Sequence, residues 1–153
     1  MLEVTDLRLG FAAGKKTLAA VDGISFAISA GETFALLGES GCGKSATAQG
    51  IMRLLPAAGH VGGGSVRLAG EELLTLPEAE MRRLRGARMA MISQEPATSL
   101  NPVTTVGDKI GEVLAVHLGL RGEPARQRML ELLRQVGIAD PERRLDEYPF
   151  QFS

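Results

Sequence analysis

Cysteine is nearly missing from this sequence, in which Cys42 is the single one among 153 residues. One cysteine forms no disulfide within its chain, so we expect a reducing compartment. The 17 basic and 18 acidic residues give a net charge of −1, which excludes a general electrostatic attraction to nucleic acid or to an anionic membrane. No apolar run reaches the roughly 18 residues of a membrane helix, and the opening residues lack the pattern of a secretory signal.

The composition is that of a folded protein, with 44% apolar and 23% charged residues. Such a balance argues against intrinsic disorder, and the length suits one domain that buries about two-thirds of its unfolded surface. Glycine is in excess: the chain has 19, whereas average composition gives about 11. Much of this excess falls in turns and in one glycine-rich loop.

Hydrophobic periodicity predicts a mixed α/β part over residues 1–94 and a mostly helical part over 95–153. Ile24, Phe26 and Ile28 should share one face of a strand, and residues 59–64 read as a flexible link. Two short apolar runs, 33–37 and 89–92, predict strands buried on both faces of a parallel sheet. The expected strands are 3–11, 21–28, 33–37, 65–68 and 89–92, and the expected helices of the first part are 44–55 and 77–85. In the second part, apolar residues recur at helical spacing over 106–114 and 129–136.

The glycine-rich loop matches the phosphate-binding pattern G-x-x-x-x-G-K-[ST]. Glycines let backbone N–H groups converge on phosphate oxygens, and the following helix points its positive end at the same anion. Lys44 would neutralise phosphate charge, and the Ser45 hydroxyl would bind Mg²⁺. The predicted nucleotide-binding residues here are Gly38, Glu39, Ser40, Gly41, Cys42, Gly43, Lys44, Ser45 and Ala46.

Other interpretations of this loop have to be weighed. A glycine-rich turn could simply connect a strand to a helix, and Cys42 could be a reactive thiolate or just a small loop residue. A GTPase would add an Asn-Lys-x-Asp motif, but the single asparagine, Asn101, precedes Pro102. The weak D-x-x-G match at 108–111 lies within helical periodicity and looks accidental. A small-molecule kinase stays possible on the loop alone.

Three stretches appear in an order that resembles the ATP-binding subunit of ABC transporters, in the oligopeptide, dipeptide and nickel importer branch. Residues 21–26 and 30–33 lead into the phosphate loop. Residues 91–96 read Met-Ile-Ser-Gln-Glu-Pro, and Ser-Leu-Asn-Pro follows at 99–102. Residues 148–153, Tyr-Pro-Phe-Gln-Phe-Ser, resemble the approach to the ABC signature.

The resemblance implies a P-loop NTPase core of ABC type, here partial, with antiparallel β elements and an incomplete helical subdomain. It implies ATP and Mg²⁺ as cofactors, with Lys44 and Gln94 as catalytic residues and Ser45 and Gln94 at the metal. Phe11 is a candidate for stacking on adenine, although a core or strand-end phenylalanine is equally compatible. Ser153 would contact the γ-phosphate bound by a partner.

It further implies a second ATP-binding subunit and transmembrane permease subunits, but no nucleic acid. The protein would be peripheral, at the cytoplasmic face of a bacterial inner membrane, and would power uptake of peptides or similar solutes.

Some features depart from the branch. Ser93 stands where members of this branch usually have Phe, and Phe150 stands where they usually have His. Tyr148, Phe150 and Phe152 are three of six aromatics, for which we expect packing within the helical part, with a partner surface as the lesser alternative. A cluster of arginines, Arg82, Arg83, Arg85 and Arg88, predicts a solvated helix face rather than a nucleic-acid site.

The larger departure is an absent Walker B strand, which would be four apolar residues followed by Asp and the catalytic Glu. The nearest string, 136–140, is followed by Pro141 and reads as a helix end. The signature glycines, the D-loop and the switch histidine are also absent, so the sequence looks cut off. We therefore expect this chain to bind nucleotide without turnover, the alternatives being a small P-loop kinase or a non-catalytic interaction fragment.

Overall fold

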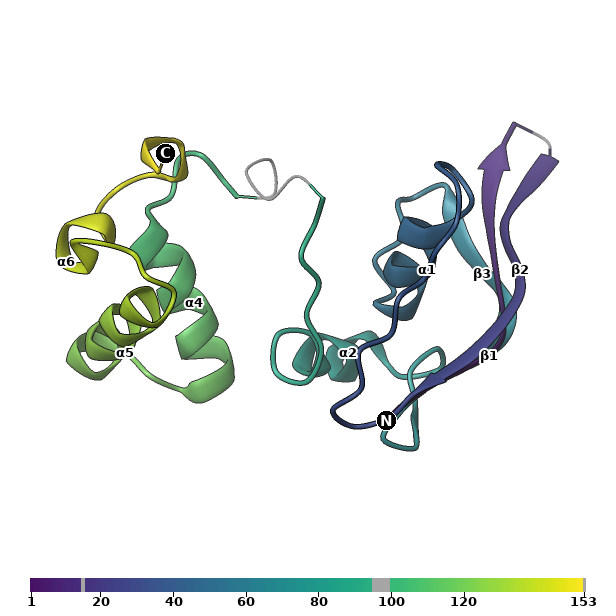
Figure 1. The fold of residues 1–153 in the computed structure, drawn as a ribbon, viewed down its shortest axis with the longest axis horizontal. Helices are drawn as coiled ribbons and strands as arrows, with labels where there is room; N and C mark the ends of the chain where they lie inside the picture. Colours follow the sequence, from purple (N-terminus) through teal and green to yellow (C-terminus); the bar gives the residue numbers. More distant parts are fainter. Residues whose placement is uncertain (15, 95–99, 153) are drawn as a thin grey trace. The chain divides into compact units, whose positions relative to one another are not determined.

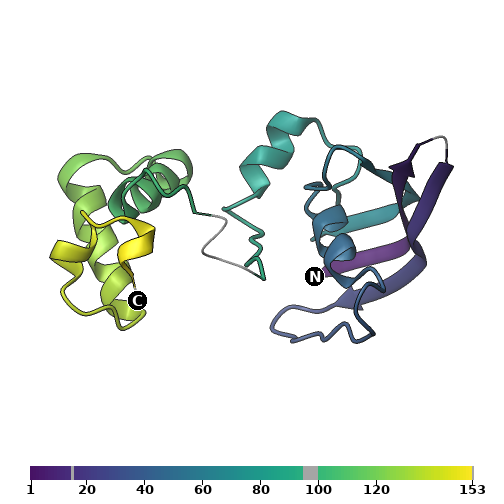
Figure 2. The ribbon, with the colours of Figure 1, turned by 90° about the horizontal axis from the view of Figure 1, so that it is seen from above.

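A computed structural model describes residues 1–14, 16–94 and 100–152, which fall into two units, Met1–Arg85 and Gly86–Ser153 (Figures 1 and 2). The first unit contains β1 (Leu2–Ala13), β2 (Lys16–Ile28), α1 (Lys44–Ile51), β3 (Gly59–Leu68), β4 (Glu71–Glu72) and α2 (Glu78–Leu84). The second contains α4 (Val106–Leu118), α5 (Gly122–Gln135), α6 (Pro141–Arg144) and the 3₁₀ turn η1 (Pro149–Gln151). No helix of the described residues is long and apolar enough to cross a membrane.

The first unit is built on an antiparallel sheet with strand order β2-β1-β3-β4. The strands expected at 3–11 and 21–28 are confirmed as parts of the β1–β2 hairpin. Ile24, Phe26 and Ile28 are each half-buried, and Ser25 and Ala27 between them are exposed, so the three share a face as predicted. The flexible link expected at 59–64 is wrong, because these glycine-rich residues pair with β1 as the first half of β3.

The core of the first unit lies between one face of the sheet and the helices. α1 contacts β1, β2 and β3 along that face (Figures 1 and 2). Leu7 and Leu9 of β1 point into the core with the spacing of a half-buried strand, and the alternation is broken between Val4 and Leu7, where the register shifts. The buried apolar side chains of this unit are Val4, Leu7, Leu9, Val21, Met52, Val66, Leu73, Met81 and Leu84.

The strands expected at 33–37 and 89–92 do not form. Residues 33–37 have no regular structure, and Leu37 is 87% exposed. Met89 makes only an isolated bridge, and Ile92 is 91% exposed. An apolar run becomes a doubly buried strand only between neighbouring strands, and the described sheet places none beside either segment.

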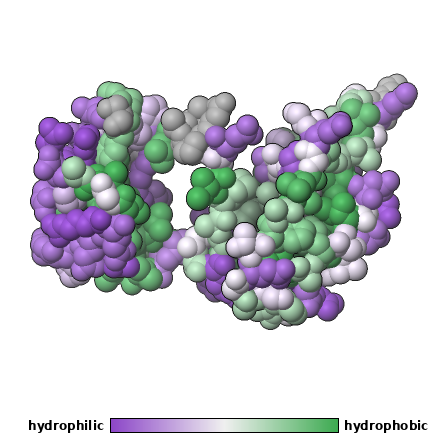
Figure 3. Space-filling view, in the orientation of Figure 1, coloured by the Kyte–Doolittle hydropathy of each residue, from purple (hydrophilic) through white to green (hydrophobic). Residues whose placement is uncertain are grey.

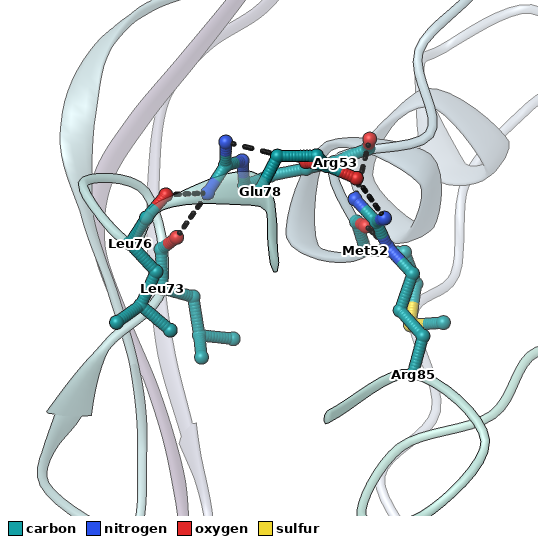
Figure 4. Close-up of polar contacts among 6 residues, drawn as sticks. All are labelled: Met52, Arg53, Leu73, Leu76, Glu78 and Arg85. Atoms are coloured by element: carbon teal, nitrogen blue, oxygen red, sulfur yellow. Dashed lines mark hydrogen bonds and ion pairs between the residues drawn. The ribbon is translucent and has the colours of Figure 1, made fainter. Parts of the chain in front are cut away.

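Two helices of the first unit differ in detail from expectation. α1 ends at Ile51 rather than near residue 55, because Arg53 takes a left-handed conformation with φ 51° that closes the helix. α2 agrees with the predicted helix, and Pro77 precedes its first residue. The expected solvated arginine face is wrong for Arg85, whose side chain is only 16% exposed and bonds to carbonyls at the end of α1 (Figure 4).

The second unit is helical, as predicted. Thr105 caps α4 by accepting a hydrogen bond from the Asp108 N–H, and Gly119 ends the helix in the left-handed conformation. The 108–111 match lies inside α4, and the 136–140 string follows the end of α5, as expected. On the face shown in Figure 3, hydrophilic residues gather over α5. The core of the second unit is formed by Leu130, Leu133 and Leu145, against which Val106, Ile110, Met129 and Ile138 pack.

The aromatic side chains near residue 150 divide into two kinds. The Phe152 ring lies under the guanidinium of Arg144, with Cζ 5.1 Å from the ring centroid. Tyr148 and Phe150 stack with their ring centroids 5.7 Å apart, but Phe150 is 72% exposed. Packing within the helical part therefore accounts for Phe152 and leaves Phe150 largely in solvent.

Glu72 makes the stability of the sheet depend on pH. Partial burial raises the pKa of this carboxyl, but hydrogen bonds from Ser65 Oγ and the N–H groups of Val66 and Leu74, together with nearby Arg67, outweigh it and lower the pKa below the usual value. A lowered folded-state pKa contributes stability that is complete above the unfolded pKa of about 4.3 and is lost as the pH falls through the folded value.

We therefore expect Glu72→Gln to lower the melting temperature at pH 7 and to have little effect in strong acid. Thermal unfolding of both proteins between about pH 2.5 and 7 measures this difference. A gap between the two melting temperatures that stayed constant over the whole range would contradict the role given to ionised Glu72.

Candidate functional site

The predicted phosphate loop lies directly before α1 and against β2. Residues 38–43 are irregular, and α1 begins at Lys44. Gly41 and Gly43 have positive φ values of 83° and 95°, which favour glycine. A Cβ on Gly43 would overlap the carbonyl oxygen of Ala20 and lie 3.2 Å from Val21 Cγ2. The last glycine of the loop therefore meets two requirements, a left-handed turn and a close approach to the backbone of β2.

Lys44 is held by the loop that precedes it. Its Nζ donates hydrogen bonds to the carbonyl oxygens of Gly38 at 2.7 Å and Glu39 at 2.6 Å, and it lies 3.6 Å from Cys42 Sγ. An ammonium group has three N–H donors, and its three contacts here are all to residues of the loop. The loop thus surrounds a positive charge, and the N–H donors of Lys44 can exchange these carbonyl acceptors for the oxygens of an anion.

The first turn of α1 supplies further donors. Gly43 caps the helix without a side-chain hydrogen bond, and the N–H of Thr47 donates to the Gly43 carbonyl. The N–H groups of residues 44–46 precede that bond, so they have no i−4 partner within the helix. Free N–H groups at the positive end of a helix dipole attract anions, and Ser45 adds a hydroxyl in the same turn.

A hollow of about 230 Å³ opens beside the loop. Residues of β2 form one wall, with Asp22 among them, and Asp22 is ion-paired to Arg8 of β1. Sequence reasoning missed this wall, because no local pattern in residues 20–24 shows which segment the loop will pack against. The full lining is Ala20, Val21, Asp22, Ile24, Leu36, Leu37, Cys42, Gly43, Lys44 and Thr47.

The loop residues 38–46 lie together in the first unit, whereas Phe11 lies away from the loop in that unit and Gln94 lies in the second unit. Phe11 belongs to β1, pairs with Leu18 and Gly59, and does not line the hollow beside Lys44. Gln94 is exposed and belongs to the second unit. Their roles at the nucleotide stay predictions. Ser153 and residues 95–99 of the Gln94 stretch lie outside the described residues.

The chemistry of the loop fits a polyphosphate that brings its own divalent ion. No group of three or more His, Cys, Asp or Glu residues in the described ranges could hold a metal. Mg²⁺ needs few protein ligands when phosphate oxygens and waters complete its shell. The hydroxyl of Ser45, next to Lys44 and the free N–H groups, is compatible with such an ion.

Comparison with known proteins decides the family. The model of the family described as "ABC transporter" matches residues 21–153, which is most of the chain. The chain belongs to the ABC transporter family. The resemblance seen in the sequence is thus confirmed, and this family's match includes the phosphate loop, Gln94 and the aromatic stretch.

Curated relatives resemble the chain along its whole length. It is 50% identical over 155 residues to the peptidoglycan transport ATP-binding protein YejF of Agrobacterium fabrum, of which it covers 28%. It is 47% identical over 154 residues to the dipeptide transport ATP-binding protein DppD of Bacillus subtilis, of which it covers 46%. All of the chain is covered in both comparisons, and it spans less than half the length of either relative.

Solved structures of the family agree on the fold. The dimeric structure of the ATP-binding cassette MJ0796 bound to ADP and Pi superposes with a TM-score of 0.84 at 22% identity, over 100% of this chain and 63% of that one. A second dimeric structure of MJ0796 gives a TM-score of 0.82 at 23% identity. The expected fold class, a partial P-loop core of ABC type with antiparallel strands and a helical part, is confirmed.

Proposed function

We propose that this chain is the ATP-binding part of an ABC transporter ATPase that powers uptake of peptides or similar small solutes. The observation that carries the proposal is Lys44 Nζ, held by two carbonyls of the loop at the uncapped start of α1. In a chain of this family, that arrangement suits the triphosphate of ATP. The names of its relatives, peptide and peptidoglycan transport proteins, support a peptide-like solute.

The residues have separate roles in this proposal. Lys44 exchanges its bonds to Gly38 and Glu39 for phosphate oxygens and neutralises their charge. The N–H groups of residues 41–46 hold the same phosphates, and Ser45 binds the Mg²⁺ that accompanies them. Gln94 would contact the metal or the attacking water, and Phe11 would stack on adenine. Mg²⁺, when bound, would supply positive charge that offsets that of the phosphates.

The proposed assembly follows the family. Residues 1–94 would form the nucleotide-binding core part, and residues 95–153 the Gln94 segment and helical subdomain. A second ATP-binding subunit and transmembrane permease subunits would be the partners, with the protein at the cytoplasmic face of a bacterial inner membrane. The dimeric MJ0796 cassettes support pairing of two such subunits.

Lys44→Ala tests the nucleotide site directly. We expect the dissociation constant for a fluorescent ATP analogue with Mg²⁺ to rise about 30-fold or more, because charge-assisted hydrogen bonds to the phosphates are lost. Lys16→Ala is the matched control, since Lys16 is an exposed lysine of the same unit. Equal affinity for all three proteins would refute the site.

Phosphate release separates this proposal from its alternatives. We propose that the 153-residue chain binds ATP without turning it over, since no Asp-Glu pair in its sequence follows four apolar residues, as a Walker B strand requires. Release of phosphate that depends on Lys44 would contradict this. Transfer of phosphate to an acceptor would favour a kinase instead.

A further inference from the structure

The helix that carries the phosphate loop has few contacts to fix it. α1 is eight residues long, and a helix of that length is unstable by itself in water. Only Thr47 and Gly50 are fully buried within it. Gly50 is packed so tightly on Leu9 that a Cβ would lie 2.6 Å from Leu9 Cδ1. With Gly43 against β2, the start and the last turn of α1 are each located by one close approach.

The end of α1 is closed by a turn that glycine usually makes. The N–H of Leu54 donates to the Gln49 carbonyl at 2.8 Å, and the N–H of Arg53 donates to the Gly50 carbonyl at 3.0 Å. This is a Schellman motif whose left-handed position is occupied by Arg53, with φ 51°. A long side chain in that conformation is strained, so the surrounding structure must hold it there.

Side chains from outside the helix hold that end. Arg85 donates from Nε to the Met52 carbonyl at 2.8 Å and from Nη2 to the Arg53 carbonyl at 3.0 Å (Figure 4). Both acceptors point out of the last turn, where carbonyls lack partners within the helix. A cation there also complements the negative end of the helix dipole.

Glu78 fixes the direction of both arginines. Its Oε1 accepts from Arg85 Nη1 at 2.5 Å, and its Oε2 lies 3.6 Å from Arg53 Nη2. Arg53 Nη1 donates in turn to the carbonyls of Leu73 at 3.1 Å and Leu76 at 2.6 Å (Figure 4). The guanidinium of Arg85 is thereby shared between α1 and α2, and only 16% of its side chain is exposed.

We propose that Arg85 is a positioning residue of the nucleotide site, which it serves by fixing the C-terminal end of α1. The inference rests on the proposed nucleotide binding. Lys44 and Ser45 lie in the first turn of α1, so a tilt at the far end moves the groups that meet the phosphates. The close approaches at Gly43 and Gly50 press the two ends of α1 against the sheet, and the Arg85 hydrogen bonds hold the left-handed turn that closes the helix. Without those bonds, the C-terminal end of α1 is held by the packing of Gly50 on Leu9 and by a strained turn.

The test compares Arg85→Ala with Arg83→Ala, which removes an exposed arginine of α2. We expect Arg85→Ala to raise the dissociation constant for the fluorescent ATP analogue with Mg²⁺ about tenfold, and to speed amide exchange in α1. Arg83→Ala should change neither. Guanidinium at millimolar concentration should restore affinity to Arg85→Ala alone, because it refills the three acceptors. Arg85→Lys should rescue only in part, since one ammonium does not reproduce the planar fork.

Each result decides between the claims. If the unsubstituted chain fails to bind the analogue, the proposed function fails. If it binds and Arg85→Ala binds equally well, the positioning role is wrong, even where the variant melts at a lower temperature. Should Arg85→Ala not fold, Glu78→Gln removes the carboxylate that orients Arg85 and leaves the exposed surface of α2 nearly unchanged. Unaltered affinity and amide exchange in α1 of Glu78→Gln would then overturn the proposal.

Discussion

Gly43→Ala is expected to reduce ATP affinity about 100-fold or more. A left-handed backbone costs an alanine about 1 kcal/mol. The larger cost comes from the new Cβ, which would overlap the Ala20 carbonyl oxygen of β2. A backbone atom in a sheet cannot rotate away, so the loop itself has to move. The start of α1, with Lys44 and Ser45, would then shift relative to β2. Titration with a fluorescent ATP analogue and Mg²⁺ measures the loss.

Gly41→Ala separates the two costs. Gly41 has a similar positive φ of 83°, but a Cβ added there would have nothing within 4 Å. This variant should therefore show only the backbone cost, a loss of affinity of about fivefold. Equal losses for Gly41→Ala and Gly43→Ala would mean that the contact with Ala20 does not set the position of the loop.

Sequence reasoning located the loop because its pattern is local. The fixed residue types from Gly38 to Ser45 serve a phosphate or its metal ion, and they are recognisable within eight consecutive residues. The hairpin of β1 and β2 was equally accessible, since alternation marks a strand with one buried face. What could not be predicted is the wall opposite Lys44, which β2 supplies through the register of the sheet.

The misplaced strands have the same physical origin. Residues 33–37 and 89–92 carry the composition of buried strands, but a strand exists only through its neighbours. The composition of a segment therefore shows only that it could form a buried strand, and pairing with neighbouring strands decides whether the strand forms. Arg85 shows the converse. Its place in a run of arginines at the end of α2 indicates a solvent-facing residue, yet its long stem lets the guanidinium reach carbonyls of α1, which no sequence pattern reveals.

Leu7→Ala is expected to be the most destabilising single truncation in the sheet. Leu7 lies on the central part of β1 and is fully buried, with 0% exposure. Truncating such a leucine costs about 2–5 kcal/mol, and the cost depends on how far the surroundings can close the cavity. Denaturant unfolding of the chain gives the change in free energy, and the melting temperature should fall by about 8 °C or more.

The backbone around Leu7 argues for the upper part of that range. Asp6 has a positive φ of 47°, and its N–H donates to Ser25 Oγ at 2.8 Å. On the other side, β3 approaches so closely at Gly64 that a Cβ there would lie 2.7 Å from Leu7 Cα. Neither strand can move inward to fill the space, so the cavity should persist. Leu18→Ala, at a leucine of the same hairpin that is 60% exposed, should cost less than about 0.5 kcal/mol. Similar losses for the two variants would show that the face of β1 carrying Leu7 is not the core that holds α1 and its loop in place.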